Sequence, residues 1–271
     1  MTGGPRILLR GGGDLATGVA ARLHRTGFQV VVCEIEQPLA VRRLVALAEA
    51  VYAGQVQIED LPAVKVANAG AVVEAWAKSQ IPVLVDPAAA SRQALNPDGL
   101  VDGRMRKQPP ELGREAAPMV IGLGPGFTAG KDCHAVVETM RGHHLGRVIW
   151  AGQAQADTGV PDPVGGKDRD RVLRAPATGV LTAVAEIGQA VEQGAALATV
   201  DGHRLEAPFD GVLRGIIHDG VAVKAGMKVG DLDPRLESGY ASQISDKALA
   251  VGGGVLEALL TRPQIRAKLA D

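Results

Sequence analysis

Aromatic residues are scarce in this chain of 271 residues and make up only 3% of it. Single-stranded nucleic-acid binders need aromatic rings on which bases can stack, so the scarcity argues against that class. The chain also lacks an excess of one charge, because 29 basic residues face 30 acidic ones and the formal net charge is −1. A surface without a field of one sign has little to hold nucleic acid or an anionic membrane. We therefore expect small molecules or other proteins as partners, with no nucleic acid and no membrane among them.

Cysteine is nearly absent, since Cys33 and Cys133 are the two thiols of the chain. They lie far apart in apolar stretches and do not resemble the framework of a disulfide-rich secreted protein. The chain also lacks a basic start followed by a long apolar stretch, and it nowhere runs about eighteen apolar residues without a charge. These absences predict a cytoplasmic protein with no signal peptide and no transmembrane helix.

Glycine, by contrast, is abundant with 35 residues, and its first cluster lies between an expected strand and an expected helix. Residues 6–10 form a short apolar run, residues 11–13 are all glycine, and apolar residues then recur at helical spacing from Val19. Gly27 is typical of a residue that ends a helix, and residues 28–35 form the β-branched run of a strand buried on both faces of a parallel sheet. The segment therefore predicts a β-α-β unit.

The alternation of strands and helices continues downstream, which is typical of a parallel α/β sheet. The expected elements are a helix over residues 38–53, a strand over 64–67, a helix over 71–79 and a strand over 81–85. From Pro118 the pattern again indicates a strand, a glycine turn and a helix. Residues 157–170 are rich in proline, glycine and aspartate, and we interpret them as a linker or surface loop.

The chain repeats itself at an offset of 32 residues, where RAPATGVLTAVAEIGQAVEQGAAL aligns without a gap over EAPFDGVLRGIIHDGVAVKAGMKV. The coinciding positions include Ala175 and Ala207, Pro176 and Pro208, Gly179 and Gly211, Gly188 and Gly220, and Gly194 and Gly226. Agreement of this kind indicates an internal duplication. Since neither copy could bury its apolar face alone, two interlocked halves should form one flattened barrel.

These patterns together predict a mostly parallel, Rossmann-like α/β domain over residues 1–165 and a duplicated all-β module over residues 172–234. A helical segment is expected over residues 235–271, with Ser245 as the N-cap of a helix whose apolar residues share one face. The expected fold class is therefore α/β, with an added all-β module and a C-terminal helix.

The first glycine cluster fits the pattern G-x-G-x-x-A through Gly11, Gly13 and Ala16, with Gly12 inside it. In a nucleotide-binding turn the first glycine permits the tight bend, the second lets a diphosphate approach the backbone, and the small third residue lets the helix pack on the strand. Amide groups and the dipole at the start of the helix would then hold the negative charge. We therefore predict a nucleotide-phosphate site at residues 11–14.

Two acidic residues bear on this predicted site. Glu34 lies at the end of the second expected strand, where a carboxylate would bind ribose hydroxyls. Asp14 lies in the first turn of the helix, where its carboxylate competes with phosphate for the same amides. The alternative is that Asp14 caps the helix and that the glycines serve close packing alone.

A second glycine turn, with Gly124, Gly126 and Thr128, follows an apolar strand and would line the same crevice. It does not match a P-loop, because Asp132 stands where a serine or threonine should follow the lysine. We interpret this turn as an anion-binding or substrate loop, with a plain turn as the alternative.

His134, Glu138 and His143 would be near one another if the segment after this turn were helical, which raises the question of a metal. A His/Glu pair at this spacing is more typical of a solvated helix face, and no further residue completes a recognised metal spacing. We therefore predict no metal site. The sequence also contains no nucleophile elbow and no C-x-x-C pair, so no catalytic residue is assigned and enzymatic activity is left open.

The duplicated module resembles the biotinyl/lipoyl barrel-sandwich hybrid, in which two such halves interlock. Carriers of that fold expose a modifiable lysine in the hairpin between the halves. Here residues 199–203 (TVDGH) occupy that hairpin and contain no lysine. The resemblance therefore implies a scaffold or docking unit that carries no covalent biotin or lipoate.

Along most of its length the sequence resembles the YqeB family, accessory proteins of selenium-dependent molybdenum hydroxylases. The stretches that carry this resemblance are LLRGGGDLATGVAARLHRTGF, VIGLGPGFTAGKDCHAVVETMRGHHLGRV, VLRAPATG, GDLDPR and ISDKALAVGGGVLEAL. The family is similar in setting to the XdhC-type maturation factors, which pair a Rossmann-like domain with handling of the molybdenum cofactor. The resemblance implies a role in maturing or selenium-loading a client molybdenum hydroxylase.

Three functions stay open at this point. The first is an accessory factor that binds a nucleotide, or the dinucleotide form of molybdopterin, at residues 11–14 with Glu34 and presents it to the client enzyme. The second is an NAD(P)-dependent oxidoreductase, which the β-α-β unit would serve equally well but for which no proton donor is evident. The third is a non-catalytic docking protein that works through residues 172–234. A homo-oligomer is compatible with all three.

Overall fold

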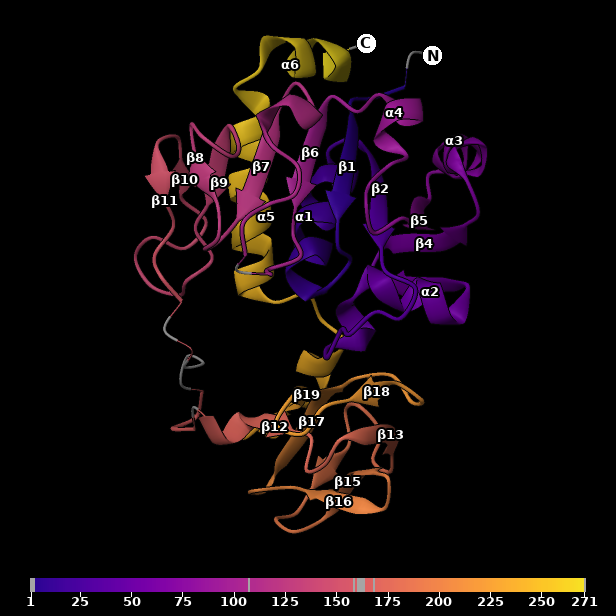
Figure 1. Ribbon diagram of the computed structural model, residues 1–271, viewed down its shortest axis with the longest axis vertical. Helices are drawn as coiled ribbons and strands as arrows, with labels where there is room; N and C mark the ends of the chain where they lie inside the picture. The colour runs from indigo at the N-terminus through magenta and orange to yellow at the C-terminus, as the bar shows by residue number, and fades with distance from the viewer. Residues whose placement is uncertain (1–2, 107, 158, 160–163, 168, 271) are drawn as a thin grey trace. The chain divides into compact units, whose positions relative to one another are not determined.

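The chain folds into two compact units. The computed structural model describes residues 3–106, 108–157, 159, 164–167 and 169–270 (Figure 1). The first unit comprises Met1–Pro38, Leu47–Asp157 and Ile244–Asp271, and the second comprises Leu39–Ala46 and Thr158–Gln243. The expected linker over residues 157–170 lies partly outside the described residues. None of the described helices is long and apolar enough to cross a lipid bilayer.

A large sheet of nine strands forms the centre of the first unit, in the order β10-β9-β7-β6-β1-β2-β5-β4-β3. Its strands are β1 (Arg6–Arg10), β2 (Gln29–Glu34), β3 (Gln55–Ile58), β4 (Leu61–Val66), β5 (Ile81–Val85), β6 (Gly99–Asp102), β7 (Val120–Leu123), β9 (Ala135–Val137) and β10 (Val148–Ile149). All neighbours from β9 to β4 run parallel, and only the outermost pairs, β10 with β9 and β3 with β4, are antiparallel. The expected α/β class with a mostly parallel sheet is therefore confirmed.

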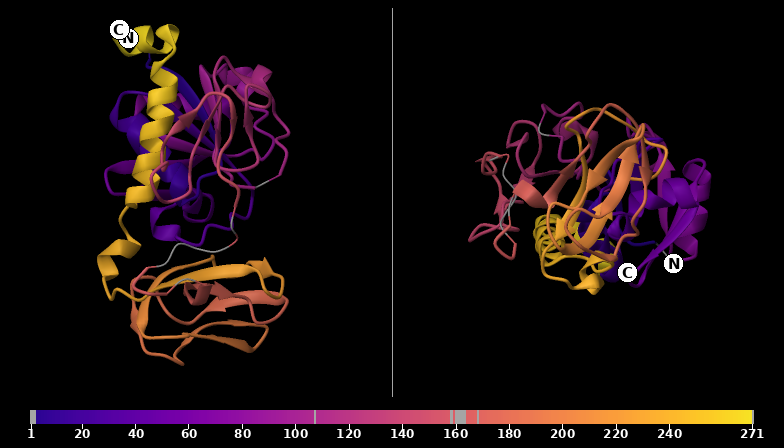
Figure 2. Two further views of the ribbon diagram at one scale, coloured as in Figure 1. Left: turned by 90° about the vertical axis from the view of Figure 1, so that its left-hand side faces the viewer. Right: turned by 90° about the horizontal axis from the view of Figure 1, so that it is seen from below.

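Two long helices, α1 (Asp14–Arg25) and α5 (Asp246–Leu260), cover one face of this sheet and pack directly on each other. Glycine permits the close approach. A Cβ added to Gly18 would lie 2.4 Å from the carbonyl carbon of Ala248, and one added to Gly252 would lie 2.4 Å from the carbonyl oxygen of Gly18. In Figure 2 the yellow helix α5 runs beside the sheet of the first unit.

The C-terminal residues thus divide differently from the expected boundaries. Ser245 caps α5, as predicted, since its hydroxyl accepts a hydrogen bond from the Ala248 amide at 3.2 Å. However, the chain from Ile244 onward, including α6 (Pro263–Ala270), belongs to the unit of the large sheet. The apolar face of α5 packs on α1, and this contact places the C-terminal residues in the first unit.

The opposite face of the sheet is covered by α3 (Ala69–Ala77) and the short helix α4 (Arg92–Leu95), over a core that includes Leu8, Val31 and Leu100. The indole of Trp76 joins this core and donates a hydrogen bond to the carbonyl oxygen of Val30 at 2.8 Å. The strand, helix and strand expected over residues 64–85 are found as β4, α3 and β5, so this part of the prediction is confirmed.

The helix expected over residues 38–53 does not form. The segment instead contains the 3-10 turns η1 (Arg43–Val45) and η2 (Leu47–Glu49) and the four-residue helix α2 (Ala50–Ala53). Its supposed apolar face is not continuous, because the side chains of Leu39 and Leu44 are 47% and 45% exposed. Arg43 also donates from Nε to the carbonyl oxygen of Ile216 at 2.8 Å, which holds its part of the segment in the second unit. These tertiary contacts override the helical spacing.

The helix expected after the second glycine turn is also wrong, because the chain there forms β8 (Thr128–Ala129) and β9. β9 extends the parallel sheet beside β7, with Val136 opposite Gly122. The β-branched Val136 and Val137 are completely buried in it, an environment that favours a strand over a helix. β8 pairs separately with β11 (Gly152–Gln153).

The second unit contains the duplication, with four strands from each copy. The strands are β12 (Val172–Arg174), β13 (Gly179–Ala183), β14 (Ala190–Val191), β15 (Ala196–Val200), β16 (His203–Glu206), β17 (Gly211–Ile216), β18 (Ala222–Val223) and β19 (Lys228–Asp233). They form two antiparallel sheets, β12-β19-β17-β14 and β16-β15-β13-β18. β14 of the first copy pairs with β17 of the second, and β18 of the second pairs with β13 of the first. Each of the two sheets therefore combines strands from both copies.

Candidate functional site

The carboxyl end of the central strand β1 is the natural place for a ligand in the first unit. The neighbours of β1 are β2 on one side and β6 on the other, so the chain connections diverge there. In open α/β sheets such a switch point leaves a crevice outside the carboxyl ends of the strands. The glycine turn that follows β1 and the segment that follows β6 lie next to each other at this edge, because a Cβ on Gly11 would be 3.1 Å from Cγ of Arg104.

The glycine turn is open to solvent at Gly13. Gly11 has φ of +88°, a conformation that favours glycine, and its amide donates to the carbonyl oxygen of Cys33 at 2.8 Å. Gly13 is the N-cap of α1. Because glycine has no side chain, no N-cap side chain accepts a hydrogen bond from the first amides of the helix. A Cβ placed on Gly13 would meet no atom of the described residues within 4 Å. Space for an anion therefore exists at the start of α1.

The turn is closed one residue earlier, at Gly12. Its amide donates to Oε2 of Glu34 at 2.8 Å, and its carbonyl oxygen accepts from the Ala48 amide at 2.9 Å. A Cβ on Gly12 would lie 2.7 Å from the Ala48 nitrogen, so this side of the turn packs tightly against backbone. The other oxygen of Glu34, Oε1, accepts from the Ile35 amide at 2.8 Å. Glu34 therefore holds the turn, and ribose hydroxyls would have to compete with two backbone amides for its carboxylate.

Asp14 and Ala16 lie in the first turn of α1. Oδ1 of Asp14 accepts a hydrogen bond from the Leu15 amide at 2.8 Å, so the carboxylate occupies one amide that a phosphate could have used. Ala16 is completely buried, and a Cβ added to Gly103 would lie 3.1 Å from the Cβ of Ala16. The small side chain of Ala16 thus lets α1 approach the chain after β6, while Asp14 serves in part the capping role given as the alternative.

A cluster of charged residues, which the sequence analysis missed, lies beside the turn. Nη1 of Arg10, at the end of β1, lies 3.2 Å from Oδ2 of Asp102, at the end of β6, and both side chains are almost completely buried. Arg104 forms two hydrogen bonds to Asp102, at 2.9 and 2.7 Å. Glu111 accepts from Arg10, Arg104 and Arg106. A signal was present in the sequence, because Arg10 and Asp102 are charged residues that end otherwise apolar strands.

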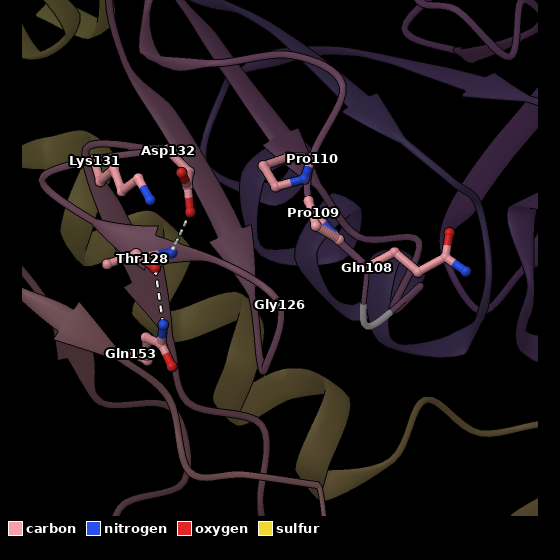
Figure 3. Close-up of a pocket in the computed structure, with 8 residues that line it drawn as sticks. All are labelled: Gln108, Pro109, Pro110, Gly126, Thr128, Lys131, Asp132 and Gln153. Atoms are coloured by element: carbon pink, nitrogen blue, oxygen red, sulfur yellow. Dashed lines mark hydrogen bonds between the residues drawn. The ribbon is translucent and has the colours of Figure 1, made fainter.

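The second glycine turn borders a hollow of about 300 Å³. Figure 3 shows Thr128, Lys131, Asp132 and Gln153 on one side of it and residues 108–110 on the other. The Thr128 amide donates to Oδ2 of Asp132 at 2.9 Å, and Nε2 of Gln153 donates to the Thr128 hydroxyl at 3.0 Å. These polar groups are thus already paired with each other, and Lys131 brings a positive charge to the lining.

Of the three residues predicted for this loop, Gly126 and Thr128 line the hollow and Gly124 does not. Gly124 has φ of +67°, and its amide donates to the carbonyl oxygen of Val137 at 2.9 Å. A Cβ on it would lie 2.4 Å from Oγ1 of Thr139. Gly124 therefore acts as a turn residue packed against Val137 and Thr139. At this position the structure agrees with the alternative of a plain turn.

His134 and Glu138 do not share a helical face, because they flank the strand β9. Nδ1 of His134 accepts a hydrogen bond from the Val120 amide at 2.9 Å. Glu138 is buried and accepts from the amides of Thr139, Met140 and Gln155, each at 2.8 Å. Among the described residues no three His, Cys, Asp or Glu side chains are grouped so as to hold a metal. Glu138 therefore organises the backbone at the end of β9.

Burial makes both thiols poor nucleophiles. It raises the pKa of Cys33, at the end of β2, to about 12, and that of Cys133 to about 11. Because the thiolate is the reactive form, neither cysteine would react readily at neutral pH. Sγ of Cys33 also forms a hydrogen bond with the hydroxyl of Ser91 at 3.6 Å.

Protonation of His134 should weaken the fold. Burial lowers the pKa of His134 from the ordinary value of 6.5, so the unfolded chain binds this proton before the folded chain does. The stabilising contribution of neutral His134 is therefore fully present above pH 6.5. It is lost as the pH falls toward the lower pKa that His134 has in the folded chain. We expect His134→Ala to reduce the free energy of unfolding more at about pH 7.5 than at about pH 5, measured by urea denaturation. An equal loss at both pH values would contradict this account.

Comparison with known proteins adds a homologue along most of the chain. No family model matches the sequence. Over 254 residues the chain is 44% identical to the uncharacterized protein YqeB of Escherichia coli strain K12, a match that covers 94% of this chain and 47% of that protein. Among solved structures, an aspartoacylase family protein from Mesorhizobium loti is 10% identical with a TM-score of 0.27, covering 85% of this chain and 84% of that one.

The sequence match bears on the family resemblance. It extends over 254 residues, or 94%, of this chain. The chain spans about half the length of that curated relative, at 47%. The comparison therefore supports the resemblance to the YqeB family for the part of that protein that this chain covers.

Proposed function

We propose that this chain is an accessory factor of the YqeB type that binds a nucleotide, or a nucleotide-bearing cofactor, at the turn between β1 and α1. The observation that carries the proposal is the open space at Gly13, at the start of a twelve-residue helix and at the carboxyl end of the central strand. The positive end of the helix dipole favours an anion at such a position. The arginines beside the turn add positive charge for a diphosphate.

The geometry favours phosphate binding over a complete dinucleotide site of the dehydrogenase kind. In that kind of site the carboxylate after β2 binds the ribose. Here both oxygens of Glu34 accept hydrogen bonds from backbone amides, of Gly12 and Ile35. The contact to Gly12 also uses an amide that a dinucleotide would need. An NAD(P)-dependent oxidoreductase is therefore the less supported alternative.

The resemblance extends the proposal to a partner. A nucleotide-bearing ligand for a factor of this type would be the dinucleotide form of molybdopterin, delivered in the cytoplasm to a selenium-dependent molybdenum hydroxylase. The exchange of strands between the two repeats supports a barrel-sandwich fold for the second unit. Its hairpin at residues 199–203 contains no lysine, so we assign this unit a docking role with no covalent biotin or lipoate.

The decisive experiment is calorimetric titration of the purified full chain with NAD(P), ADP, ATP, CTP and molybdopterin cytosine dinucleotide. We expect at least one of these ligands to bind, with the affinity falling as salt is raised, because the contacts are to phosphate. Silence from all five would contradict the proposal. Docking is tested separately, by capture of a molybdenum hydroxylase with the full chain and with a chain lacking residues 172–234. Capture that survives the deletion would argue against the docking role.

A further inference from the structure

We propose that Arg10, Arg104 and Arg106 form an oxyanion site for a phosphoryl group, and that the carboxylate of Glu111 occupies this site until a ligand displaces it. The inference deepens the proposed function, on which it rests for the nature of the ligand. It assigns to the ligand a second phosphate contact besides the glycine turn, and it gives the site an internal competitor.

Glu111 is held as a bound anion would be. Its Oε2 lies 3.3 Å from Nη1 of Arg10 and 2.6 Å from Nη2 of Arg104, and its Oε1 accepts from Nη1 of Arg106. One carboxylate thus contacts three guanidinium groups. The hydrogen bond from Arg104 lowers the pKa of the Glu111 carboxyl to about 2, so this residue is an anion at neutral pH. A ligand must therefore compete with a negative charge that is already present.

Arg10 and Arg104 do not depend on Glu111 for their positions. Asp102, whose side chain is 5% exposed, holds Nη1 of Arg10 at 3.2 Å and two nitrogens of Arg104. Nη2 of Arg10 also donates to the carbonyl oxygen of Pro87 at 3.1 Å. Glu111, in contrast, is 48% exposed, whereas the side chains of Arg10 and Arg104 are 3% and 17% exposed. The side chain of Arg106 is as exposed as that of Glu111, at 49%. The buried part of the cluster, Arg10 and Arg104 with Asp102, therefore carries a net positive charge, and Glu111 is bound at its exposed side.

The charge balance favours an added anion. Without Glu111, the three positive charges of the arginines are balanced by the single carboxylate of Asp102, and Arg106 keeps its hydrogen bond to Gln108. In addition, Nε of Arg10 is buried without a hydrogen-bond acceptor among the described residues. A phosphoryl group brings three oxygens and nearly two negative charges, and guanidinium groups bind such oxygens in pairs. It satisfies three arginines better than one carboxylate does.

The position of the cluster links it to both glycine turns. Arg104 lies against Gly11, since a Cβ on Gly11 would be 3.1 Å from its Cγ, so the arginines border the turn that we propose for the diphosphate. Glu111 follows Pro109 and Pro110, which line the hollow at the second turn (Figure 3).

The test is Glu111→Gln, which removes the charge and keeps the shape. We expect inorganic pyrophosphate to bind about tenfold more tightly to this variant than to the wild-type chain in calorimetry, because the competitor is lost. Glu115→Gln is the matched control. It removes the same charge nearby, but Glu115 is exposed and accepts from the Gly113 amide at 3.3 Å. Thermal unfolding checks that both variants fold.

Equal pyrophosphate affinity of Glu111→Gln and the wild type, or an equal gain in the Glu115→Gln control, would overturn the inference. An equal gain for malonate, a dicarboxylate, would overturn the phosphoryl assignment. Binding of a nucleotide to the wild type without any effect of Glu111→Gln would leave the proposed function intact and remove this inference alone. A pyrophosphate gain in Glu111→Gln without nucleotide binding would retain the oxyanion site and reject the proposed function.

Discussion

Gly13→Val should lower the affinity for a nucleotide ligand about 10- to 100-fold while the protein stays folded, as expected for loss of hydrogen bonds to a charged group. The structure gives separate reasons for the two halves of this result. A side chain at Gly13 would project into open space, with no atom of the described residues within 4 Å of its Cβ, so no clash opposes folding. That same space is where a phosphate would reach the amides of α1, and a β-branched side chain would fill it.

The stability of this variant needs its own measurement. Gly13 is the N-cap of α1 with φ of −68°, a value open to any residue, so valine adds no backbone strain there. Valine is a poorer N-cap than glycine, and we expect a loss of about 1 kcal/mol in the free energy of unfolding. Gly13→Ala, with a smaller side chain, should lose less affinity than Gly13→Val. Nucleotide binding at wild-type affinity in both variants would locate the site elsewhere.

Local sequence signals were sufficient to predict part of this fold. The β1-turn-α1 unit was predictable because the residues that shape it are neighbours in the chain, and Gly27, with φ of +89°, ends α1 as expected. The duplication was evident because an alignment at one fixed offset matches turn glycines and strand residues together. In the second unit the corresponding strands of the two copies, such as β13 and β17, begin at the matching Gly179 and Gly211.

The errors arose where distant parts of the chain decide the local structure. Residues 39–46 follow the contacts of the second unit, and neither those contacts nor the exposure of Leu39 and Leu44 can be inferred from helical spacing. The valines of β9 fit a helical pattern and a strand equally well until the edge of β7 is available to pair with them.

The site shows the same limitation. Arg10 and Asp102 are far apart in sequence and meet only because β1 and β6 are neighbours in the sheet. The spacing of G-x-G-x-x-A predicts the glycine turn between β1 and α1, which is found, but it could not indicate that Ala48 covers Gly12 or that Glu34 binds the Gly12 amide. The motif predicts a backbone shape, and the parts of the chain packed around it determine which amides stay accessible.

Two adjacent glycines of α5 should respond in opposite ways to alanine, and the pair tests the packing that closes the first unit. Gly252→Ala should lower the free energy of unfolding by about 3 kcal/mol, the upper range for overpacking, because its Cβ would lie 2.4 Å from the carbonyl oxygen of Gly18. Gly253→Ala should raise it by up to about 1 kcal/mol, since alanine favours the helix and no described atom lies within 4 Å. Urea denaturation of both variants measures the difference. Equal effects would show that α5 does not contact α1 through Gly252.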